Sequence, residues 1–407
     1  MQKYDVIIVG GGIVGSTLAC ILLQHGMHIA LIEAQAPITK TANDIDLRVY
    51  ALTRASEQIF RNIYAWQHME KQRVSPFQQM HVWDAQGSGE IHFDSAEIKQ
   101  PTLGYIVEQH VIQAGLAHCL NEFDNLTVYQ PAQVQQFEVT DNVVTVTLDN
   151  QHTVTGQLLV GAEGANSPVR TLAGINYHLY DYAQQAVVAT VTTEYPHQAT
   201  AWQRFLPTGP LAFLPLRNEH QCSIVWSADT PVAQRLVNLD KTAFQQALGE
   251  AFAFKLGDIT DVSPRNVFPL KRRHAFHYVK PRVAIIGDAA HTIHPLAGQG
   301  VNLGLLDAAT LAEVVTETYD QQCDVGHYKY LRRYERQRKG NNLLTMTAMD
   351  GFKYVFGQRS LPLTWLRNVG LTVTNQVTPV KHHLIEQAMG LTGHLPRIAS
   401  SVHSNSH

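Results

Sequence analysis

The amino-terminal part of this chain alternates short apolar runs with a helical pattern. Residues 4–9 form a nearly continuous apolar run, as expected for a parallel strand that is buried on both faces. A helical pattern follows through Leu23, and a second apolar run, residues 28–32, ends at Glu33. This strand, helix and strand in sequence predict the beginning of a parallel α/β sheet.

The middle of the chain has a different pattern, with short alternating segments separated by turn residues. Residues 78–94 predict two short strands around a Gly-Ser-Gly turn, and residues 143–155 predict a small hairpin. Alternating strands are further expected within residues 184–228, at 186–191, 202–206 and 222–226. From about residue 326 the pattern is helical, up to a polar tail at residues 400–407.

These patterns predict an α/β protein with a Rossmann-like nucleotide-binding domain, an inserted, mostly antiparallel β-sheet domain and a helical carboxyl terminus. The discontinuous nucleotide-binding domain is expected to comprise residues 1–76, 98–174 and 279–345. The inserted sheet is expected to wall off a substrate, and to comprise residues 77–97 and 175–278. The carboxyl-terminal region is expected to comprise residues 346–407.

A glycine motif lies directly after the first expected strand. Gly10 allows a tight turn, Gly12 lets the backbone approach a pyrophosphate, and Gly15 lets the helix pack closely on the strand. Glu33 ends the second strand eighteen positions after Gly15, where a carboxylate can accept both ribose hydroxyls. The chain has only one such motif, because the glycines at 161–164 precede neither a third glycine nor a long helix. One dinucleotide is therefore expected in the Rossmann manner.

A second glycine-rich segment follows the apolar run at residues 283–286. It contains Asp288, Gly298, Gly300 and Gly304, and a helix is expected to open at residue 300. Such a turn presents backbone N–H groups and the positive end of a helix. The N1–C2=O edge of a flavin suits this position, because that edge becomes negative when the ring is reduced. A helix-capping loop is the structural alternative. The two motifs together favour a flavin dinucleotide held along its length over a nicotinamide that must come and go.

Composition excludes several other classes of protein. The chain has 407 residues and a formal net charge of −3, with no basic runs, which argues against binding of nucleic acid. Its four cysteines form no CxxC pair and no metal spacing, so a reducing cytoplasm is expected and a disulfide reductase is disfavoured. No signal-peptide layout and no apolar run of membrane-spanning length is evident.

Beyond these patterns, the chain resembles the single-component FAD aromatic hydroxylases of the p-hydroxybenzoate hydroxylase fold. Within them it most resembles the ubiquinone-biosynthesis hydroxylases of the UbiH/UbiF/UbiI group. The phrases FLPL, SIVW and AMGLTGHLP look most like the members that hydroxylate ring carbon C5, with the C6 enzymes close behind. The matching segments cover almost the whole chain and are residues 10–19, 46–56, 104–116, 159–170, 213–216, 223–226, 287–304 and 388–396.

The resemblance implies binding roles at the adenosine and pyrophosphate end of FAD. Glu33 would hold the adenosine ribose, Arg48 would lie over the pyrophosphate, and Gln109 would touch the phosphates or adenosine. Asp288 would bind the ribityl or pyrophosphate region. Glu163 stands where the family usually has aspartate, one methylene shorter, in a motif that serves both FAD and NAD(P)H.

The resemblance also implies contacts to the flavin ring and gives no general base. Pro295 would line the reaction side of the ring. The residues expected to face the isoalloxazine are Gly298, Gln299, Gly300, Val301 and Asn302.

The implied reaction is monooxygenation of a polyprenyl phenol in ubiquinone biosynthesis, at C5, with NAD(P)H and O2 as co-substrates and a flavin C4a-hydroperoxide as the hydroxylating species. Hydroxylation at C6 or C1 is the nearest alternative. A flavin-dependent prenyl reductase and a non-catalytic flavin scaffold in a biosynthetic complex are alternatives of other classes.

The expected location is cytoplasmic, with peripheral contact at the inner face of the membrane and with other ubiquinone-biosynthesis proteins. The aromatic and basic residues of 352–367 are the candidate contact, although core packing is the commoner role of such residues.

Two further groups of polar residues favour structural roles. His291 and His294 lie three apart, but no third ligand completes a metal site, so helix capping or contacts within the flavin loop are expected. The arginines at 332, 333, 336 and 338 with Glu335 predict a solvated, salt-bridged helix face.

Overall fold

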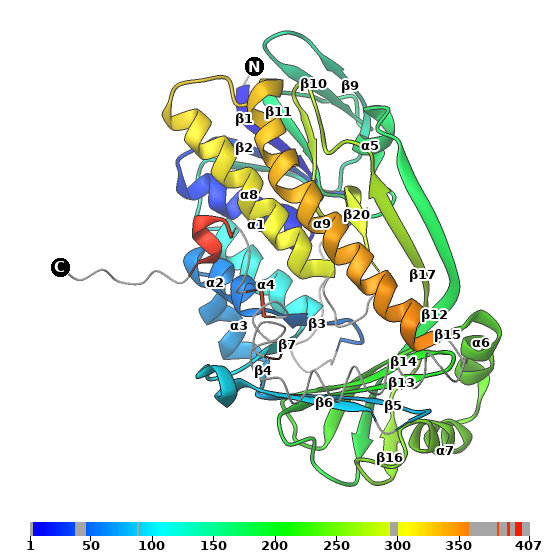
Figure 1. Cartoon of the computed structure of the whole chain (residues 1–407). Coiled ribbons are helices and arrows are strands. Elements are labelled where there is room, and N and C mark those ends of the chain that lie inside the picture. Colours follow the sequence, from blue (N-terminus) through cyan, green and yellow to red (C-terminus); the bar gives the residue numbers. More distant parts are fainter. Residues whose placement is uncertain are drawn as a thin grey trace.

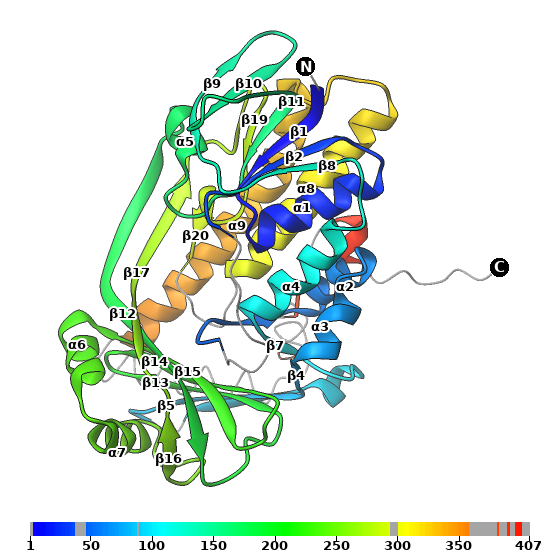
Figure 2. The same cartoon turned by 180° about the vertical axis from the view of Figure 1, so that it is seen from behind.

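A computed structural model describes residues 3–36, 46–87, 89–293, 300–357, 381, 389–390 and 395–400. Its elements form an upper layer around a largely parallel sheet and a lower layer around a second, mostly antiparallel sheet (Figure 1). Two long strands run along one side of the molecule and connect the layers (Figure 2).

The upper sheet is centred on β1 (Lys3–Val9), the first apolar run of the sequence. Val6, Ile7 and Ile8 of this strand are fully buried, as a two-sided parallel strand requires. The strand order is β18-β19-β11-β1-β2-β8, and β10 and β9 extend β11 as an antiparallel hairpin. The bounds of its other strands are β2 (Ile29–Ile32), β8 (Leu126–Tyr129), β9 (Val134–Val139), β10 (Val144–Leu148), β11 (Thr153–Gly161), β18 (Val279–Lys280) and β19 (Val283–Ile285).

Helices cover this sheet and bring the two glycine motifs together. α1 (Ile13–Gln24) begins directly after the first motif and packs against both α8 (Gly300–Asp320) and α4 (Gln109–Leu120). α9 (Tyr328–Gly357) lies beside α8 (Figure 1). A small sheet of β3 (Val49–Leu52), β7 (Gly104–Glu108) and β4 (Val74–Phe77) lies next to α2 (Arg54–Asn62) and α3 (Trp66–Gln72).

The lower sheet has the order β20-β17-β12-β15-β14-β13-β5-β6, with β16 paired to β12. α6 (Thr230–Asn238) and α7 (Lys241–Ala251) lie on its outer side (Figure 1). Its strands are β5 (Gln79–Asp84), β6 (Glu90–Asp94), β12 (Tyr177–Thr193), β13 (Thr200–Leu206), β14 (Gly209–Pro215), β15 (Gln221–Asp229), β16 (Ile259–Val262), β17 (Asn266–Ala275) and β20 (His291–Thr292). The shorter elements are α5 (Pro168–Leu172) and three 3-10 turns, η1 (Ser95–Ile98), η2 (Gly287–Ala289) and η4 (Arg397–Ala399).

Several sequence predictions are confirmed by these elements. The expected hairpins at residues 78–94 and 143–155 are the pairs β5–β6 and β10–β11. The strands expected at 186–191, 202–206 and 222–226 lie within β12, β13 and β15, and the fold class is the expected one. The lower sheet draws on both expected pieces of the insert, residues 77–97 and 175–278, and β20 joins it from outside them. The domain boundaries themselves stay predictions.

Candidate functional site

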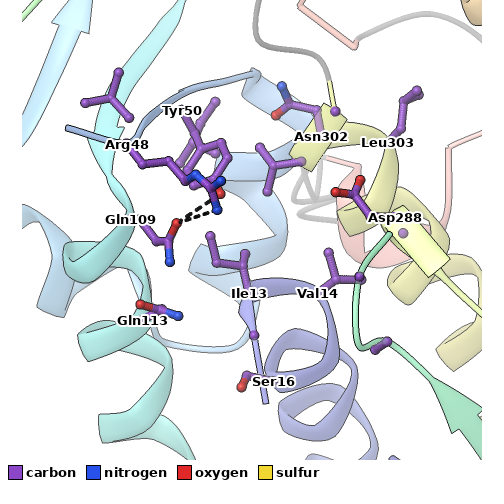
Figure 3. Close-up of a pocket in the computed structure, with 18 of the residues that line it drawn as sticks. Ile13, Val14, Ser16, Arg48, Tyr50, Gln109, Gln113, Asp288, Asn302 and Leu303 are labelled. Carbon is purple, nitrogen blue, oxygen red and sulfur yellow. Dashed lines mark hydrogen bonds between the residues drawn. The ribbon is translucent and has the colours of Figure 1, made fainter. Parts of the chain in front are cut away.

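A cavity of about 2010 Å³ lies between the two layers. Its upper wall is formed by the glycine turn before α1, the end of β2, residues 46–53, the start of α4, η2 and the start of α8. Its lower wall is the inner face of the antiparallel sheet. Figure 3 shows part of the upper wall, where Ile13, Arg48, Gln109, Asp288 and Asn302 from separate elements gather around one space.

The three glycines of the first motif have three different environments. Gly10 has a φ of +103°, and a Cβ there would lie 2.6 Å from the backbone of Ala162. A Cβ on Gly15 would lie 2.0 Å from the carbonyl oxygen of Gly10, so close packing requires this glycine. A Cβ on Gly12 would meet no atom within 4 Å, and Gly12 lines the cavity at the N-terminus of α1. This is the surface that a pyrophosphate needs, with bare backbone at the positive end of a helix.

Glu33 lies at the carboxyl end of β2, beside the glycine turn. Its Oε2 accepts from the Gly11 N–H at 2.7 Å, and its Oε1 accepts from the Gln35 N–H at 2.7 Å. These bonds orient the carboxylate at the cavity rim. Each carboxylate oxygen keeps a further lone pair for an incoming hydroxyl. The geometry is compatible with the predicted ribose contact.

The side chains of Arg48 and Gln109 meet at the cavity wall, and their predicted contacts with FAD stay predictions. Arg48 Nη1 lies 3.4 Å from Gln109 Oε1, and the Tyr50 hydroxyl donates to the same oxygen at 3.3 Å (Figure 3). The Arg48 guanidinium also lies 5.4 Å from the ring centroid of Phe268 in the lower sheet. Tyr50 was missed by the sequence analysis. The available signal was its position two residues after Arg48, because alternate residues of an extended segment lie on one face.

Asp288 lies in η2, deep within the molecule, with its side chain exposed to the cavity. Desolvation of the carboxyl group within the protein raises the pKa of Asp288. The positive charges of His291, Arg48 and Arg273 oppose this rise. Gly287 before it has a φ of +58°, which favours glycine.

The beginning of α8 faces the same cavity. A Cβ on Gly304 would lie 2.7 Å from Val14 Cγ2, so this glycine serves the packing of α8 on α1. Gly300 has no comparable contact, and it lines the cavity together with Val301 and Asn302. Pro295, Gly298 and Gln299 lie outside the described residues, so their predicted roles beside the flavin ring stay predictions.

The side chain of Asn302 is engaged with protein rather than pointed freely into the cavity. Its Oδ1 accepts from the Thr53 N–H at 3.1 Å and from Ser56 Oγ at 2.7 Å. Its Nδ2 donates to the Ala51 carbonyl oxygen at 2.8 Å. Asn302 therefore ties the start of α8 to the end of β3 and the N-cap of α2.

The Glu163 side chain caps the start of a helix. Its Oε1 accepts from the Val169 N–H at 2.7 Å, and its Oε2 accepts from Ser167 Oγ at 2.9 Å, both at the start of α5. Burial raises the pKa of Glu163, and these hydrogen bonds oppose the rise. Glu163 still borders the cavity. Its predicted contact with FAD or NAD(P)H stays a prediction.

The prediction of a solvated face for Glu335 and Arg338 is wrong. Their side chains are buried, at 2% and 3% exposed, because α9 turns this face toward α8 and the upper sheet. His291 is also buried and pairs with Asp307 of α8. Within the described part of the chain, no three potential ligands are placed to hold a metal ion.

The lower wall of the cavity is mainly apolar and arises from strand alternation. Along β14, Leu211 and Phe213 are fully buried in the core beneath α6 and α7. Ala212 and Leu214, which alternate with them, line the cavity. The same alternation exposes one face of β12 and β15 to the cavity through the side chains of Ala186, Val188, Val225 and Ser227.

The residues present fit FAD. Gly12 leaves room for a pyrophosphate at a helix N-terminus, Glu33 marks the end of β2, and the cavity continues past Asp288 to the start of α8. When bound, FAD supplies the activation of O2 and the transfer of one oxygen atom, and the protein supplies position and exclusion of water.

Comparison with known proteins agrees with this geometry. Residues 3–342 match the family described as "FAD binding domain". Over 97% of this chain and 99% of the other, the fold matches p-nitrophenol 4-monooxygenase from Pseudomonas putida DLL-E4, at a TM-score of 0.77 and 18% identity. The family match makes this chain an FAD-binding protein, and its fold is that of the FAD-dependent monooxygenases, a class that uses O2 and NAD(P)H as co-substrates.

Comparison with individual relatives narrows the assignment to one family of FAD-binding proteins. The chain is 35% identical to the 3-demethoxyubiquinol 3-hydroxylase of Escherichia coli K12, over 96% of this chain and 99% of that protein. It is 36% identical to the mitochondrial ubiquinone biosynthesis monooxygenase of Homo sapiens, over 94% of this chain and 92% of that protein. The chain therefore belongs to the family of FAD-dependent hydroxylases that contains these ubiquinone-biosynthesis enzymes. Among the described residues, no helix is both long and apolar enough to cross a membrane.

Proposed function

We propose that this protein hydroxylates ring carbon C5 of a polyprenyl phenol in ubiquinone biosynthesis. Family membership supports the hydroxylase chemistry, and the names of the relatives support the pathway. The choice of C5 over C6 or C1 rests on the sequence phrases at 213–216, 223–226 and 388–396.

The observation that carries the proposal is the extent and lining of the cavity. Its volume of about 2010 Å³ is roughly twice the upper end of ordinary ligand pockets, which is about 1,000 Å³. The upper wall presents backbone and polar groups suited to a dinucleotide. The lower wall presents apolar side chains from β12, β14 and β15, suited to an aromatic ring with a hydrocarbon tail. One continuous space can therefore hold both.

The residues of the chain have separable tasks in this proposal. Gly12 and Glu33 would hold the adenosine diphosphate end of FAD, and Asp288 would contact its middle. The N-terminus of α8 at Gly300 would offer backbone N–H groups to the ring edge that becomes negative on reduction. The apolar face of the lower sheet orients the substrate ring and keeps water away from the reacting atoms.

Product analysis tests the proposal directly. The purified FAD-loaded enzyme would be given NAD(P)H, isotopically labelled O2 and a short-tailed prenyl phenol, and the product examined by mass spectrometry and NMR. We expect one labelled oxygen atom at C5. Oxygen at C6 or C1 would overturn the proposed regiochemistry, but the protein would still be an FAD-dependent hydroxylase. Gain of two hydrogens in the tail without oxygen would instead identify a prenyl reductase. Absence of substrate-stimulated NAD(P)H oxidation would identify a non-catalytic scaffold.

The substrate also leads to a proposal about location. A long polyprenyl tail is insoluble in water, so we propose that the cytoplasmic enzyme meets its substrate at the inner face of the membrane or on another ubiquinone-biosynthesis protein. The candidate contact is the aromatic and basic stretch at residues 352–367, whose side chains lie outside the described residues. Trp365→Ser and Phe356→Ser should lower activity on long-tailed phenols more than on short-tailed ones. Equal loss on both would point to damage of the core, and no loss on either would contradict the contact.

A further inference from the structure

A group of buried charged side chains lies between α8 and α9 at the upper wall of the cavity, and one of its members, Arg338, borders the cavity. Its centre is Asp307 of α8, which is fully buried and uses both carboxylate oxygens. Oδ1 accepts from Arg338 Nε at 2.8 Å and from Asn342 Nδ2 at 3.1 Å. Oδ2 accepts from the Gly287 N–H at 3.1 Å and from His291 Nε2. Four donors from three separate segments therefore converge on one carboxylate.

The partners of Asp307 belong to segments that border the cavity. Gly287 begins the turn that carries Asp288, and His291 begins β20, whose next residue, Thr292, lines the cavity. Arg338 also donates from Nη2 to the Leu303 carbonyl oxygen at 3.4 Å, in the first turn of α8. Figure 3 shows Asp288 and Leu303 on adjoining parts of the cavity wall. The network thus connects the Asp288 turn with the start of α8.

Because these charges are buried, each of them depends on its hydrogen-bond partners. A carboxylate inside a protein is tolerated only when it is paired and hydrogen-bonded, and removal of one partner leaves an uncompensated charge. Burial by itself raises the pKa of Asp307, but His291 and Arg338 lower it to about 2, so the group is an anion at neutral pH. Tyr278 and Tyr334 close off the group with fully buried rings. Displacement of either cavity segment would break bonds that water cannot readily replace.

We propose that Asp307, with His291 and Arg338, is a positioning unit for bound FAD. The unit fixes the distance between the Asp288 turn and the first turn of α8. Both segments can then contact the flavin half of bound FAD at the same time. It acts through Asp288 and the backbone of α8. The inference depends on FAD binding and not on which ring carbon is hydroxylated.

A matched pair of substitutions in the full-length enzyme tests the positioning unit. Asp307→Asn keeps the shape of the side chain. It replaces one acceptor oxygen by an amide N–H₂ group, which then faces hydrogen-bond donors. The control is Glu317→Gln, which removes another α8 carboxylate that pairs with an α9 arginine, Arg333, at 2.7 Å near the surface. We expect Asp307→Asn to weaken FAD binding at least about tenfold and to shift the midpoint potential and visible circular dichroism of bound flavin. Glu317→Gln should leave all three unchanged.

Arg338→Lys gives a graded comparison, because lysine keeps the charge but cannot bond Asp307 and Leu303 together as the guanidinium does. We expect a smaller loss of FAD affinity and a smaller shift of potential than in Asp307→Asn. A folded Asp307→Asn enzyme with unchanged FAD affinity, potential and flavin spectrum would overturn the proposal, even if it melted at a lower temperature. If Asp307→Asn does not fold, Arg338→Lys decides, and wild-type affinity and potential in that variant would overturn it.

Discussion

The two walls of the cavity are built by different means. The upper wall depends on backbone geometry at a few positions, above all Gly10, Gly12 and Gly15, where the absence of a side chain is the functional property. The lower wall depends on side-chain alternation in long strands, where Phe213 belongs to the core and Leu214 to the cavity. A ligand held by backbone groups needs particular residues at fixed spacing, whereas a ligand held by an apolar surface needs only volume and shape.

The largest expected effect concerns Gly12, the glycine of the first motif whose Cβ would meet no protein atom within 4 Å. Gly12→Val should abolish FAD binding, because its side chain would occupy the space beside the N-terminus of α1 that a pyrophosphate needs. The apoprotein should still fold, since a Cβ at Gly12 meets no atom within 4 Å. Fluorescence titration with FAD and circular dichroism would measure binding and folding.

Two controls define that result. Gly340→Val, at another glycine whose Cβ would meet no atom within 4 Å, should bind FAD normally. Gly15→Val should disrupt folding even without FAD, because its Cβ would lie 2.0 Å from the Gly10 carbonyl oxygen. Normal FAD affinity in folded Gly12→Val would remove the assignment of the upper wall to a dinucleotide.

The next largest effect separates the two faces of β14. Phe213→Ala should lower the free energy of unfolding by about 3–5 kcal/mol, because Phe213 is fully buried and stacks on Phe252 at 3.8 Å between ring centroids. Leu214→Ala should cost less stability and should raise KM for the prenyl phenol, because Leu214 lines the cavity. Urea unfolding and steady-state kinetics would measure both. Equal changes in stability and KM for the two variants would contradict the assignment of faces.

A smaller effect is expected at the junction of the two walls. Asp288→Ala should weaken FAD binding by about 1–3 kcal/mol, the range for leaving a buried hydrogen-bonding group without its partner. The variant should retain its fold, since the Asp288 side chain is exposed to the cavity rather than packed in the core. Isothermal titration with FAD checks the prediction. An unaltered dissociation constant would mean that the turn contributes only structure.

The smallest effect is a change in pH dependence at His274 of β17, where the lower sheet meets β20. Burial lowers the pKa of His274 from 6.5 to about 4, and nearby His291, Lys339, Arg272 and His178 add to the effect. The neutral imidazole therefore stabilises the fold fully above pH 6.5, and this contribution is lost as the pH falls toward 4. His274→Asn should lose less unfolding free energy between pH 7 and pH 5 than the wild type.

Denaturant titrations at the two pH values measure this difference. His152→Asn, at an exposed histidine, serves as the control and should follow the wild-type pH dependence. If the unfolding free energy of His274→Asn fell between pH 7 and pH 5 as much as that of the wild type, other groups would cause the loss of stability in acid.

Local sequence patterns led to residues that the structure places on the cavity wall. The glycine turn, Glu33 and Asp288 were identified because each follows an apolar run at a fixed spacing. Tyr50 was missed, since only the fold brings β3 beside the start of α4, where Gln109 accepts its hydroxyl. The bonds of the Asn302 side chain to Thr53 and Ser56 were also missed, while its predicted place beside the flavin ring stays a prediction. Asn302 and Thr53 lie about 250 positions apart, and no pattern in the sequence indicates that they are in contact.

The sequence by itself determined the α/β class, the dinucleotide turn and the alternating strands of the lower sheet, because strand and helix periodicity and glycine spacing act over a few residues. The tertiary structure alone decided which face of each lower strand meets the cavity and which charges of α9 are buried. Arg338 and Arg333 lie five positions apart on one charged helix, yet one pairs with Asp307 in the core and the other with Glu317 near the surface. The helix pattern is the same for both, and only the packing of α9 on α8 separates them.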